Sequence, residues 1–221
     1  MTLYHGPDLR VTIGFHNKED WCNQRAFFTD NSLVIGGHTV MEHWQKSYMK
    51  ALTEIVTRNG GSILEVGYGL GLAAQFIQKS GDVMNHVIIE CHPDVIRKCK
   101  KIYDKEILSG KVALYEDFWE NITFQFLEDS FNGILFDTYP LSEKEIRKNH
   151  FFFFNEAYRL LRKGGVLTYY SDEDENFSKE HLNKLKKAGF KNINSRIIEV
   201  KPPKQSSYWK KGTMLAPIII K

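Results

Sequence analysis

A glycine-rich turn is the first group of residues in this chain that could bind a ligand. Glu65, Gly67, Gly69 and Gly71 occupy alternate positions at the end of a short apolar run. Glycine permits a positive φ and carries no side chain, so a ligand can approach the backbone closely at such a turn. A dinucleotide fingerprint needs a further glycine at position 72, where this chain has Leu72. The spacing therefore disfavours NAD.

Glu90 is the second candidate ligand-binding residue. It lies near the end of another apolar run, 23 residues after Gly67. In nucleotide-binding folds, an acidic side chain at about this separation binds the hydroxyl groups of a ribose. The alternative is that Glu90 is a surface cap of a helix that begins at Pro93. Together with the glycine turn, Glu90 predicts a ribose-containing ligand at the carboxyl edge of a sheet.

Asp137 is the third candidate, and it directly follows the apolar run at residues 131–136. Doubly wound folds place ligand-contacting groups at this position, just beyond the carboxyl end of a strand. A carboxylate there could orient a basic group and accept a proton from it. The alternative is a turn residue that precedes Thr138 and Pro140.

These residues need a scaffold that brings the ends of several strands together. Short apolar runs predict buried strands, and they alternate with segments in which apolar residues recur at helical spacing. The alternation predicts an α/β fold with a doubly wound parallel sheet and helices on both faces. A closing antiparallel pair would leave the sheet mostly parallel. The predicted strands are residues 62–67, 86–91, 112–115, 131–136 and 165–170, and the closing pair is 193–200 and 214–220.

The N-terminal part of the chain has a different pattern. Residues 1–35 show no clear period, and we expect an irregular arm or lid over residues 1–40 and a core over residues 41–221. Apolar residues from Met41 to Asn59 recur at helical spacing and predict a helix before the first strand. No low-complexity linker divides the chain, which predicts a single domain. Further helices are predicted at residues 72–79, from Pro93 onward, at 151–161 and at 177–187.

The composition is that of a folded enzyme. The 221 residues are 42% hydrophobic and 26% charged, and the 30 basic and 27 acidic residues are spread along the chain. The chain therefore has no basic block of the kind that would predict binding to nucleic acid. Three cysteines without a CxxC pair suit reduced thiols in the cytoplasm, and the eight histidines lack the spacing of a metal site. No run is long enough to cross a membrane, and the N-terminus does not resemble a secretory signal.

Several stretches between Gly36 and the C-terminus match the pattern of one enzyme family. PheAspThrTyrProLeuSerGlu at 136–143 is the most specific, whereas IleLeuGluValGlyTyrGly at 63–69 is common to many enzymes. The chain resembles guanidinoacetate N-methyltransferase and its relatives. The resemblance implies a seven-stranded Rossmann-like methyltransferase fold and S-adenosylmethionine as the cofactor. The other matches are MetGluHisTrp at 41–44, TyrMet at 48–49, IleIleGluCys at 88–91, ArgLeuLeu at 159–161, GlyGlyValLeuThrTyr at 164–169, AlaGlyPhe at 188–190 and the prolines at 202 and 203.

The resemblance also implies roles for individual residues. Glu90 would hold the ribose hydroxyls, and Asp137 would face the reacting nitrogen together with Gln45 and Tyr139. Trp21 would close the substrate pocket. Without the family, Met41 and Met49 would be assigned to plain core packing on a helix. The residues implied to bind the cofactor are Met41, Met49, Gly67, Gly69, Gly71, Leu72, Ala73, Ala74, Glu90, Phe118 and Trp119.

The chemistry of methyl transfer supports a role for Asp137. The reaction needs a nitrogen lone pair aimed at a sulfonium methyl carbon, and a protonated guanidino group has no free lone pair. A carboxylate that fixes the guanidinium plane and accepts a proton as the bond forms would lower the barrier.

Two positions depart from the family at the substrate. The family has a glutamate where this chain has Gln45, and a neutral amide supplies no charge for a guanidino group. After the predicted strand at 165–170, four acids, Asp172 to Glu175, replace a short polar segment that receives the substrate carboxylate in the family. These acids would repel a carboxylate and attract a cation, or they could form a solvated loop that caps the next helix.

The leading hypothesis is an S-adenosylmethionine-dependent N-methyltransferase for a guanidino or amino group in a small molecule or an arginine-containing peptide. One alternative is an O-methyltransferase of a small natural-product intermediate. Another is a non-catalytic partner subunit that keeps the cofactor site. The sequence predicts no metal, nucleic-acid or membrane partner, and it leaves the acceptor and the oligomeric state open.

Overall fold

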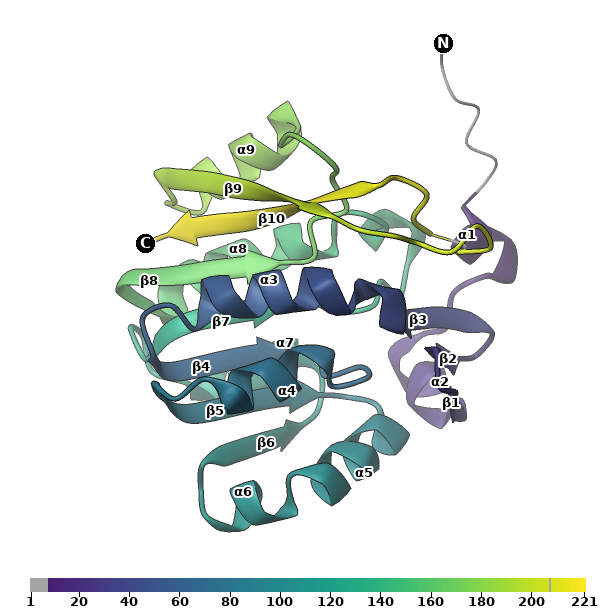
Figure 1. The fold of residues 1–221 in the computed structure, drawn as a ribbon, viewed down its shortest axis with the longest axis horizontal. Helices are drawn as coiled ribbons and strands as arrows, with labels where there is room; N and C mark the ends of the chain where they lie inside the picture. Colours follow the sequence, from purple (N-terminus) through teal and green to yellow (C-terminus); the bar gives the residue numbers. More distant parts are fainter. Residues whose placement is uncertain (1–7, 207) are drawn as a thin grey trace.

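The computed structural model describes residues 8–206 and 208–221, and its centre is a seven-stranded sheet in the order β6-β5-β4-β7-β8-β10-β9 (Figure 1). The strands β4 to β8 pair in parallel, and β10 runs antiparallel to both β8 and β9. The strands are β4 (Gly61–Val66), β5 (Val83–Glu90), β6 (Val112–Glu116), β7 (Phe131–Phe136), β8 (Leu161–Tyr169), β9 (Asn192–Glu199) and β10 (Thr213–Ile220). The predicted mostly parallel, seven-stranded sheet is confirmed, with strand ends that differ by up to four residues.

Helices cover both faces of this sheet, as the alternation predicted (Figure 1). Helices α3 to α5 contribute apolar side chains to one hydrophobic cluster, and α7 to α9 contribute to a second. Successive strand residues alternate between the clusters: Leu135 belongs to the first, and Ile134 and Phe136 belong to the second. The helices are α3 (Lys46–Val56), α4 (Leu72–Lys79), α5 (Pro93–Ile102), α6 (Asp104–Leu108), α7 (Trp119–Ile122), α8 (Asn149–Leu160) and α9 (Lys179–Lys187), with short 3-10 turns η1 (His43–Gln45), η2 (Thr123–Gln125) and η3 (Glu143–Glu145).

The N-terminal segment is more regular than its sequence predicted. It forms α1 (Leu9–Ile13), α2 (Lys18–Asn23) and a three-stranded antiparallel sheet of β1 (Ala26–Phe28), β2 (Ser32–Ile35) and β3 (His38–Glu42). The expectation of an irregular arm over residues 1–40 was therefore wrong for these elements, while residues 1–7 lie outside the described part. Strands of three to five residues are too short to show a clear alternation of apolar and polar residues in the sequence. Pairing between the strands stabilises them instead.

The N-terminal segment packs on the main sheet. Trp21 of α2, Leu33 of β2 and Met41 of β3 are buried in the same hydrophobic cluster as Leu52 of α3. The backbone N–H of Ala26 also donates to the Asp94 carboxylate in the first turn of α5, at 2.8 Å. These contacts fix the segment over the carboxyl ends of the strands, where it can cover a site.

The predicted helix from Met41 to Asn59 was wrong at its beginning. Met41 lies in β3, paired with Leu33, and the helix α3 starts only at Lys46. A capping box between Glu42 and Gln45 separates the two elements. Strand pairing therefore overrides the helical spacing of the first residues in this stretch.

None of the helices in the described part of the chain has the length and apolar character that a membrane-spanning helix needs.

Candidate active site

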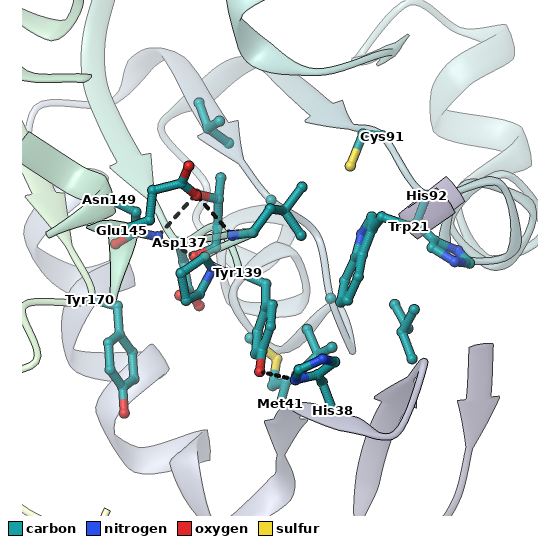
Figure 2. A pocket seen from close by; sticks show the side chains of 18 of the residues that line it. Trp21, His38, Met41, Cys91, His92, Asp137, Tyr139, Glu145, Asn149 and Tyr170 are labelled. Atoms are coloured by element: carbon teal, nitrogen blue, oxygen red, sulfur yellow. Dashed lines mark hydrogen bonds between the residues drawn. The ribbon is translucent and has the colours of Figure 1, made fainter. Parts of the chain in front are cut away.

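A cavity of about 430 Å³ lies between the carboxyl ends of the parallel strands and the N-terminal segment (Figure 2). This size is in the range of small-molecule sites, about 300–1,000 Å³. The cavity brings together residues that lie far apart in the sequence, and it includes many of the residues predicted for the site. The predicted residues that line it are Trp21, Met41, Gln45, Gly67, Gly69, Glu90, Phe118, Trp119, Asp137 and Tyr139.

The glycine turn lies between β4 and α4 at one side of this cavity. Gly67, Gly69 and Gly71 all have positive φ, at 90°, 55° and 75°. A Cβ atom at Gly67 would lie 2.0 Å from the backbone oxygen of Asp137. The turn therefore needs glycine for its conformation and for the close approach of the chain after β7.

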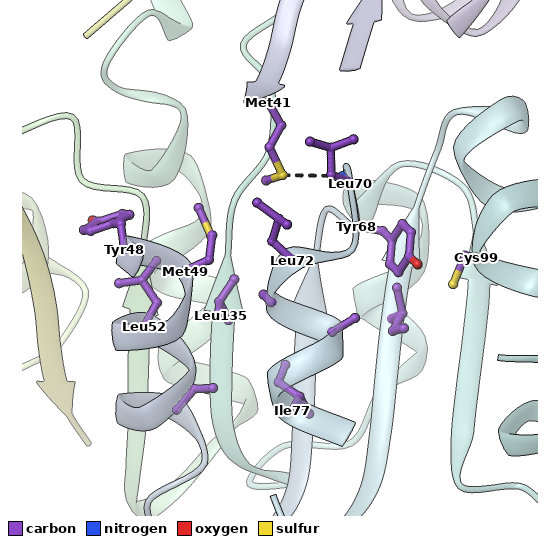
Figure 3. Close-up of a cluster of buried hydrophobic side chains, with 14 of the residues drawn as sticks. Met41, Tyr48, Met49, Leu52, Tyr68, Leu70, Leu72, Ile77, Cys99 and Leu135 are labelled. Carbon is purple, nitrogen blue, oxygen red and sulfur yellow. Dashed lines mark hydrogen bonds between the residues drawn. The ribbon is translucent and has the colours of Figure 1, made fainter. Parts of the chain in front are cut away.

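Met41 packs directly over the glycine turn (Figure 3). Its Sδ accepts a weak hydrogen bond from the Leu70 N–H at 3.4 Å. A Cβ atom at Gly69 would lie 3.1 Å from the same sulfur. The thioether thus touches bare backbone and borders the cavity from β3, and not from a helix as predicted.

Five other residues expected at the cofactor do not line the cavity. Met49 points from α3 into the core with its side chain fully buried (Figure 3). Gly71 is the N-cap of α4, and the residues after it pack between that helix and the sheet. Plain core packing, the alternative weighed for Met49, describes its position. The five residues are Met49, Gly71, Leu72, Ala73 and Ala74.

Glu90 ends β5 with its carboxylate beside the glycine turn. One oxygen accepts the N–H groups of Tyr68 at 2.9 Å and Gly69 at 3.4 Å. The other accepts the N–H groups of Cys91 and His92, both at 2.9 Å. Glu90 therefore orders the backbone of the glycine turn and of the residues after β5, and it is not a surface cap of α5, whose N-cap is His92.

Asp137 follows β7 and is held by its backbone. Its N–H donates to the Val66 carbonyl at 2.9 Å, next to the glycine turn. The segment after it is fixed by Asn149, whose amide donates to the Thr138 carbonyl, and by Glu145, which accepts the Leu141 N–H at 2.8 Å (Figure 2). No described residue donates a hydrogen bond to the Asp137 carboxylate. The cavity therefore presents a rigidly placed carboxylate with open acceptor capacity.

The pKa of Asp137 is raised to about 7. Burial is the largest cause, followed by the negative charges of Asp172 and Glu65. A carboxyl with a pKa near neutrality is suited to accept a proton from a substrate at physiological pH.

Aromatic side chains form one wall of the cavity (Figure 2). Trp21 stacks on Tyr139 with ring centroids 5.2 Å apart and an interplanar angle of 6°. The Tyr139 hydroxyl and Nδ1 of His38 share a hydrogen bond of 3.0 Å. Trp21 is 4% exposed and lines the cavity, so α2 covers the cavity at this wall.

The structure also places residues in the cavity that the sequence did not indicate. Arg10, His38 and Asn149 line the cavity, but their positions in the sequence match no motif that would have indicated this. Tyr208 lies in the link between β9 and β10, and it lines the cavity and donates to Gln45 Oε1 at 3.1 Å. The unusual length of that link for a hairpin was the available signal for Tyr208.

Comparison with known proteins decides the family. A family model described as guanidinoacetate N-methyltransferase matches residues 10–221. The chain belongs to the guanidinoacetate N-methyltransferase family. It is an S-adenosylmethionine-dependent methyltransferase, as predicted. The bare glycine turn, the carboxylate of Glu90 beside it and the size of the cavity fit this cofactor.

The individual relatives share modest sequence identity with the chain. Protein arginine N-methyltransferase 2 of Aspergillus fumigatus is 25% identical over 214 residues, which are 92% of this chain and 47% of that protein. The Kluyveromyces lactis protein of the same name is 32% identical over 123 residues, 51% of this chain and 29% of that protein. The chain thus spans less than half the length of these relatives.

Solved structures support the fold. Spermidine synthase from Thermotoga maritima has a TM-score of 0.64 at 15% identity, covering 89% of this chain and 72% of that chain. M. jannaschii TYW2 in complex with AdoMet has a TM-score of 0.59 at 14% identity, covering 89% and 84%. At this identity the likeness concerns the fold alone.

Proposed function

We propose that this enzyme methylates a guanidino nitrogen of an arginine-like small molecule or of an arginine-containing peptide. One observation carries the proposal: Asp137, a carboxylate with open acceptor capacity, is hydrogen-bonded through its backbone to Val66, the residue before the glycine turn. The proton acceptor for a basic nitrogen therefore lies beside the loop that fits the cofactor. The name that the fungal relatives carry, protein arginine N-methyltransferase 2, supports the same acceptor group.

The cofactor would lie along the carboxyl ends of β4 and β5. Glu90 would accept a hydrogen bond from a ribose hydroxyl at the oxygen whose bond from the Gly69 N–H is long, 3.4 Å, because backbone N–H groups already occupy its other acceptor positions. Phe118 and Trp119, which follow β6, would flank the adenine, and Met41 would pack against the methionine part. Leu72, Ala73 and Ala74 would support the glycine turn from the core and would make no direct contact with the cofactor.

Proton transfer to Asp137 would accompany methyl transfer. S-adenosylmethionine supplies an electrophilic methyl group on a sulfonium. Asp137 would hold the guanidinium plane, which aims one nitrogen at that methyl group. As the new N–C bond forms, one N–H proton would pass to the carboxylate, and the C–S electron pair would stay on sulfur. The proton would then leave to solvent, which restores the carboxylate for the next turnover.

The charge of the cavity favours a cationic acceptor. Acidic side chains outnumber basic ones in its lining, and the two basic residues are already paired, Arg10 with Asp8 and Lys18 with Glu120. A lining of this sign attracts a guanidinium and repels a free carboxylate. In the described part of the lining, the seven acids are Asp8, Glu90, Asp117, Glu120, Asp137, Glu145 and Asp172, and the arginine and lysine residues are Arg10 and Lys18.

A nitrogen acceptor is preferred over the oxygen acceptor considered from sequence because the family is one of N-methyltransferases.

The cysteines described are all free thiols, which supports a cytoplasmic location.

Mass spectrometry of the products tests this proposal. Purified protein with S-adenosylmethionine would be offered agmatine, arginine, guanidinoacetate and a peptide with blocked ends and one arginine. We expect a mass increase of one methyl group on agmatine or on the peptide, located on a guanidino nitrogen by fragmentation. Methylation of none of these guanidino compounds would contradict the proposal.

A further inference from the structure

The amide of Gln45 is oriented by its neighbours. Its Oε1 accepts the backbone N–H of Glu42 at 2.8 Å and the Tyr208 hydroxyl at 3.1 Å. The acceptor end of the amide is therefore occupied by two donors, which leaves the Nε2 donor for the cavity that Gln45 lines. A guanidinium carries only N–H donors. Gln45 thus offers a guanidinium an N–H donor and no free acceptor, and its neutral amide supplies no negative charge.

The four acids after β8 do not act alike. Glu173 accepts the N–H of Ser178 at 3.0 Å, at the N-terminus of α9, and lies 3.2 Å from Nδ1 of His181. Asp174 pairs with Lys211, and Glu175 is exposed. Asp172 is the only one of the four that lines the cavity.

The backbone around Asp172 explains why its side chain faces the cavity. On one side, the Ser171 hydroxyl donates to the Leu215 carbonyl at 2.7 Å. On the other side, the Leu215 N–H donates to the Glu173 carbonyl at 2.8 Å. Asp172 lies between these two anchors with a φ of 56°, in the left-handed region that aspartate tolerates better than most residues. The turn therefore holds its side chain at the cavity.

Asp172 and Asp137 are placed to act together. They follow the neighbouring parallel strands β8 and β7, in which Tyr169 is the register partner of Phe136. No described residue donates a hydrogen bond to the Asp172 carboxylate or forms an ion pair with it. Two arginines, Arg10 and Arg147, carry charges that act on Asp172. Arg10 gives its guanidinium to Asp8 in two hydrogen bonds of 2.9 and 2.8 Å, and Arg147 is exposed.

We infer that Asp172 supplies the second carboxylate that binds the substrate guanidinium, which is the acceptor that the Gln45 amide does not offer. The inference rests on the proposed function and makes Asp172 the residue that selects a guanidino substrate, while Asp137 accepts the proton. Two carboxylates after adjacent strands can each accept N–H groups from a guanidinium, which has five such donors in a fixed plane.

Steady-state kinetics with the blocked arginine peptide tests this inference, and Asp172→Asn keeps the shape and the tolerance for positive φ. We expect the KM of this variant to rise by at least 10-fold and kcat to change by less than about 3-fold, because the lost bond serves binding. Its affinity for S-adenosylhomocysteine, measured by calorimetry, should stay unchanged. Asp174→Asn is the matched control, since it removes a charge two residues away that is outside the cavity, and its KM should equal that of the wild type.

Moving the carboxylate provides a second test that a folding defect cannot imitate. Gln45→Glu can keep the bonds from Glu42 N–H and Tyr208 with one oxygen and present the other to the cavity. In the Asp172→Asn background, Gln45→Glu should recover most of the lost affinity for the peptide.

The outcomes separate the inference from the proposed function. An unchanged KM for Asp172→Asn, or an equal loss of S-adenosylhomocysteine affinity, would overturn the role of Asp172 while leaving guanidino methylation by the wild type intact. If the wild-type enzyme methylates neither the peptide nor agmatine, the proposed function and this inference both fail.

Discussion

Glu90 and Glu116 are register partners at the ends of neighbouring strands, yet only Glu90 lines the cavity. The Glu90 carboxylate accepts four backbone N–H groups around the glycine turn. Glu116 lies on β6 and pairs with Lys100 on the surface. Two identical side chains at the same level of the sheet thus have different surroundings, and they provide a matched pair for testing the cofactor site.

Glu90→Gln should weaken the binding of S-adenosylhomocysteine by about 1.5–3 kcal/mol, the range for hydrogen bonds to a charged group. The amide also brings two donors to a place where four backbone donors converge, so the glycine turn should lose order. Calorimetry measures the affinity, with Glu116→Gln as the control that should bind like the wild type. Unchanged binding by Glu90→Gln would remove this residue from the cofactor site.

Asp137→Asn should lower turnover on a guanidino substrate by about 10²-fold or more, because the shape remains and the proton acceptor is lost. Cofactor affinity should stay within a few-fold of the wild type. Asp129→Asn, which changes an aspartate just before β7 at the opposite end of that strand, should leave turnover unchanged. Retained turnover in Asp137→Asn would make this aspartate a structural residue only.

The strands of the central sheet and their succession along the chain could be predicted because each strand is a short apolar run with a distinct end. Asp137 and Glu90 could be predicted as site residues for the same reason, since each ends or follows such a run, and both line the cavity. The N-terminal sheet was missed because β1 to β3 depend on pairing with each other, which a local pattern does not show. Met41 was assigned to a helix because its spacing to Tyr48 is helical, although its partner is Leu33 in β2.

The site itself could be predicted only in part. Residues near strand ends, such as Gly67 and Asp137, follow from the fold. Tyr208 and Arg10 reach the cavity from segments whose path depends on tertiary contacts. The four acids after β8 were indistinguishable in the sequence, and only their separate hydrogen bonds show that Asp172 alone lines the cavity. The roles assigned to these residues remain predictions.

The pH dependence of kcat/KM should report the ionisation of Asp137. Activity requires its carboxylate, so kcat/KM should rise with pH and level off above a midpoint of about 7. Because the negative charge of Asp172 helps to raise this pKa, Asp172→Asn should move the midpoint to lower pH. The charge of Glu65, which is paired with His86, acts in the same direction and remains in the variant. A midpoint that does not move would contradict the coupling of the two aspartates.

The same ionisation should affect stability. The pKa of Asp137 rises from 3.8 to about 7 on folding, so the folded protein binds more protons than the unfolded chain between these values. This residue therefore favours folding at low pH, and its contribution is lost as pH rises through that window. Asp137→Asn lacks the charge and should exceed the wild type in Tm at about pH 8 by at least 2–4 °C, the shift that about 1 kcal/mol gives in a protein of this size. Near pH 4 the two proteins should unfold at similar temperatures, and an equal gain at both pH values would exclude ionisation of Asp137 as the cause.

Substrate choice should depend on whether a free carboxylate lies close to the guanidino group. In guanidinoacetate the two groups are one carbon apart, so a guanidinium bound between Asp137 and Asp172 would bring its carboxylate against an acidic cavity. Among the residues that the structure describes, Arg10 provides the one guanidinium of the cavity lining, and it is committed to Asp8. We therefore expect kcat/KM for agmatine to exceed that for guanidinoacetate by about 10-fold or more, since one unfavourable charge contact costs about 1–2 kcal/mol at a partly buried site. Initial rates with labelled S-adenosylmethionine at matched substrate concentrations measure this ratio, and added salt should reduce it where the repulsion is exposed to solvent. Efficient methylation of guanidinoacetate, with a lower KM than for agmatine, would show that the acids near the cavity do not select the substrate.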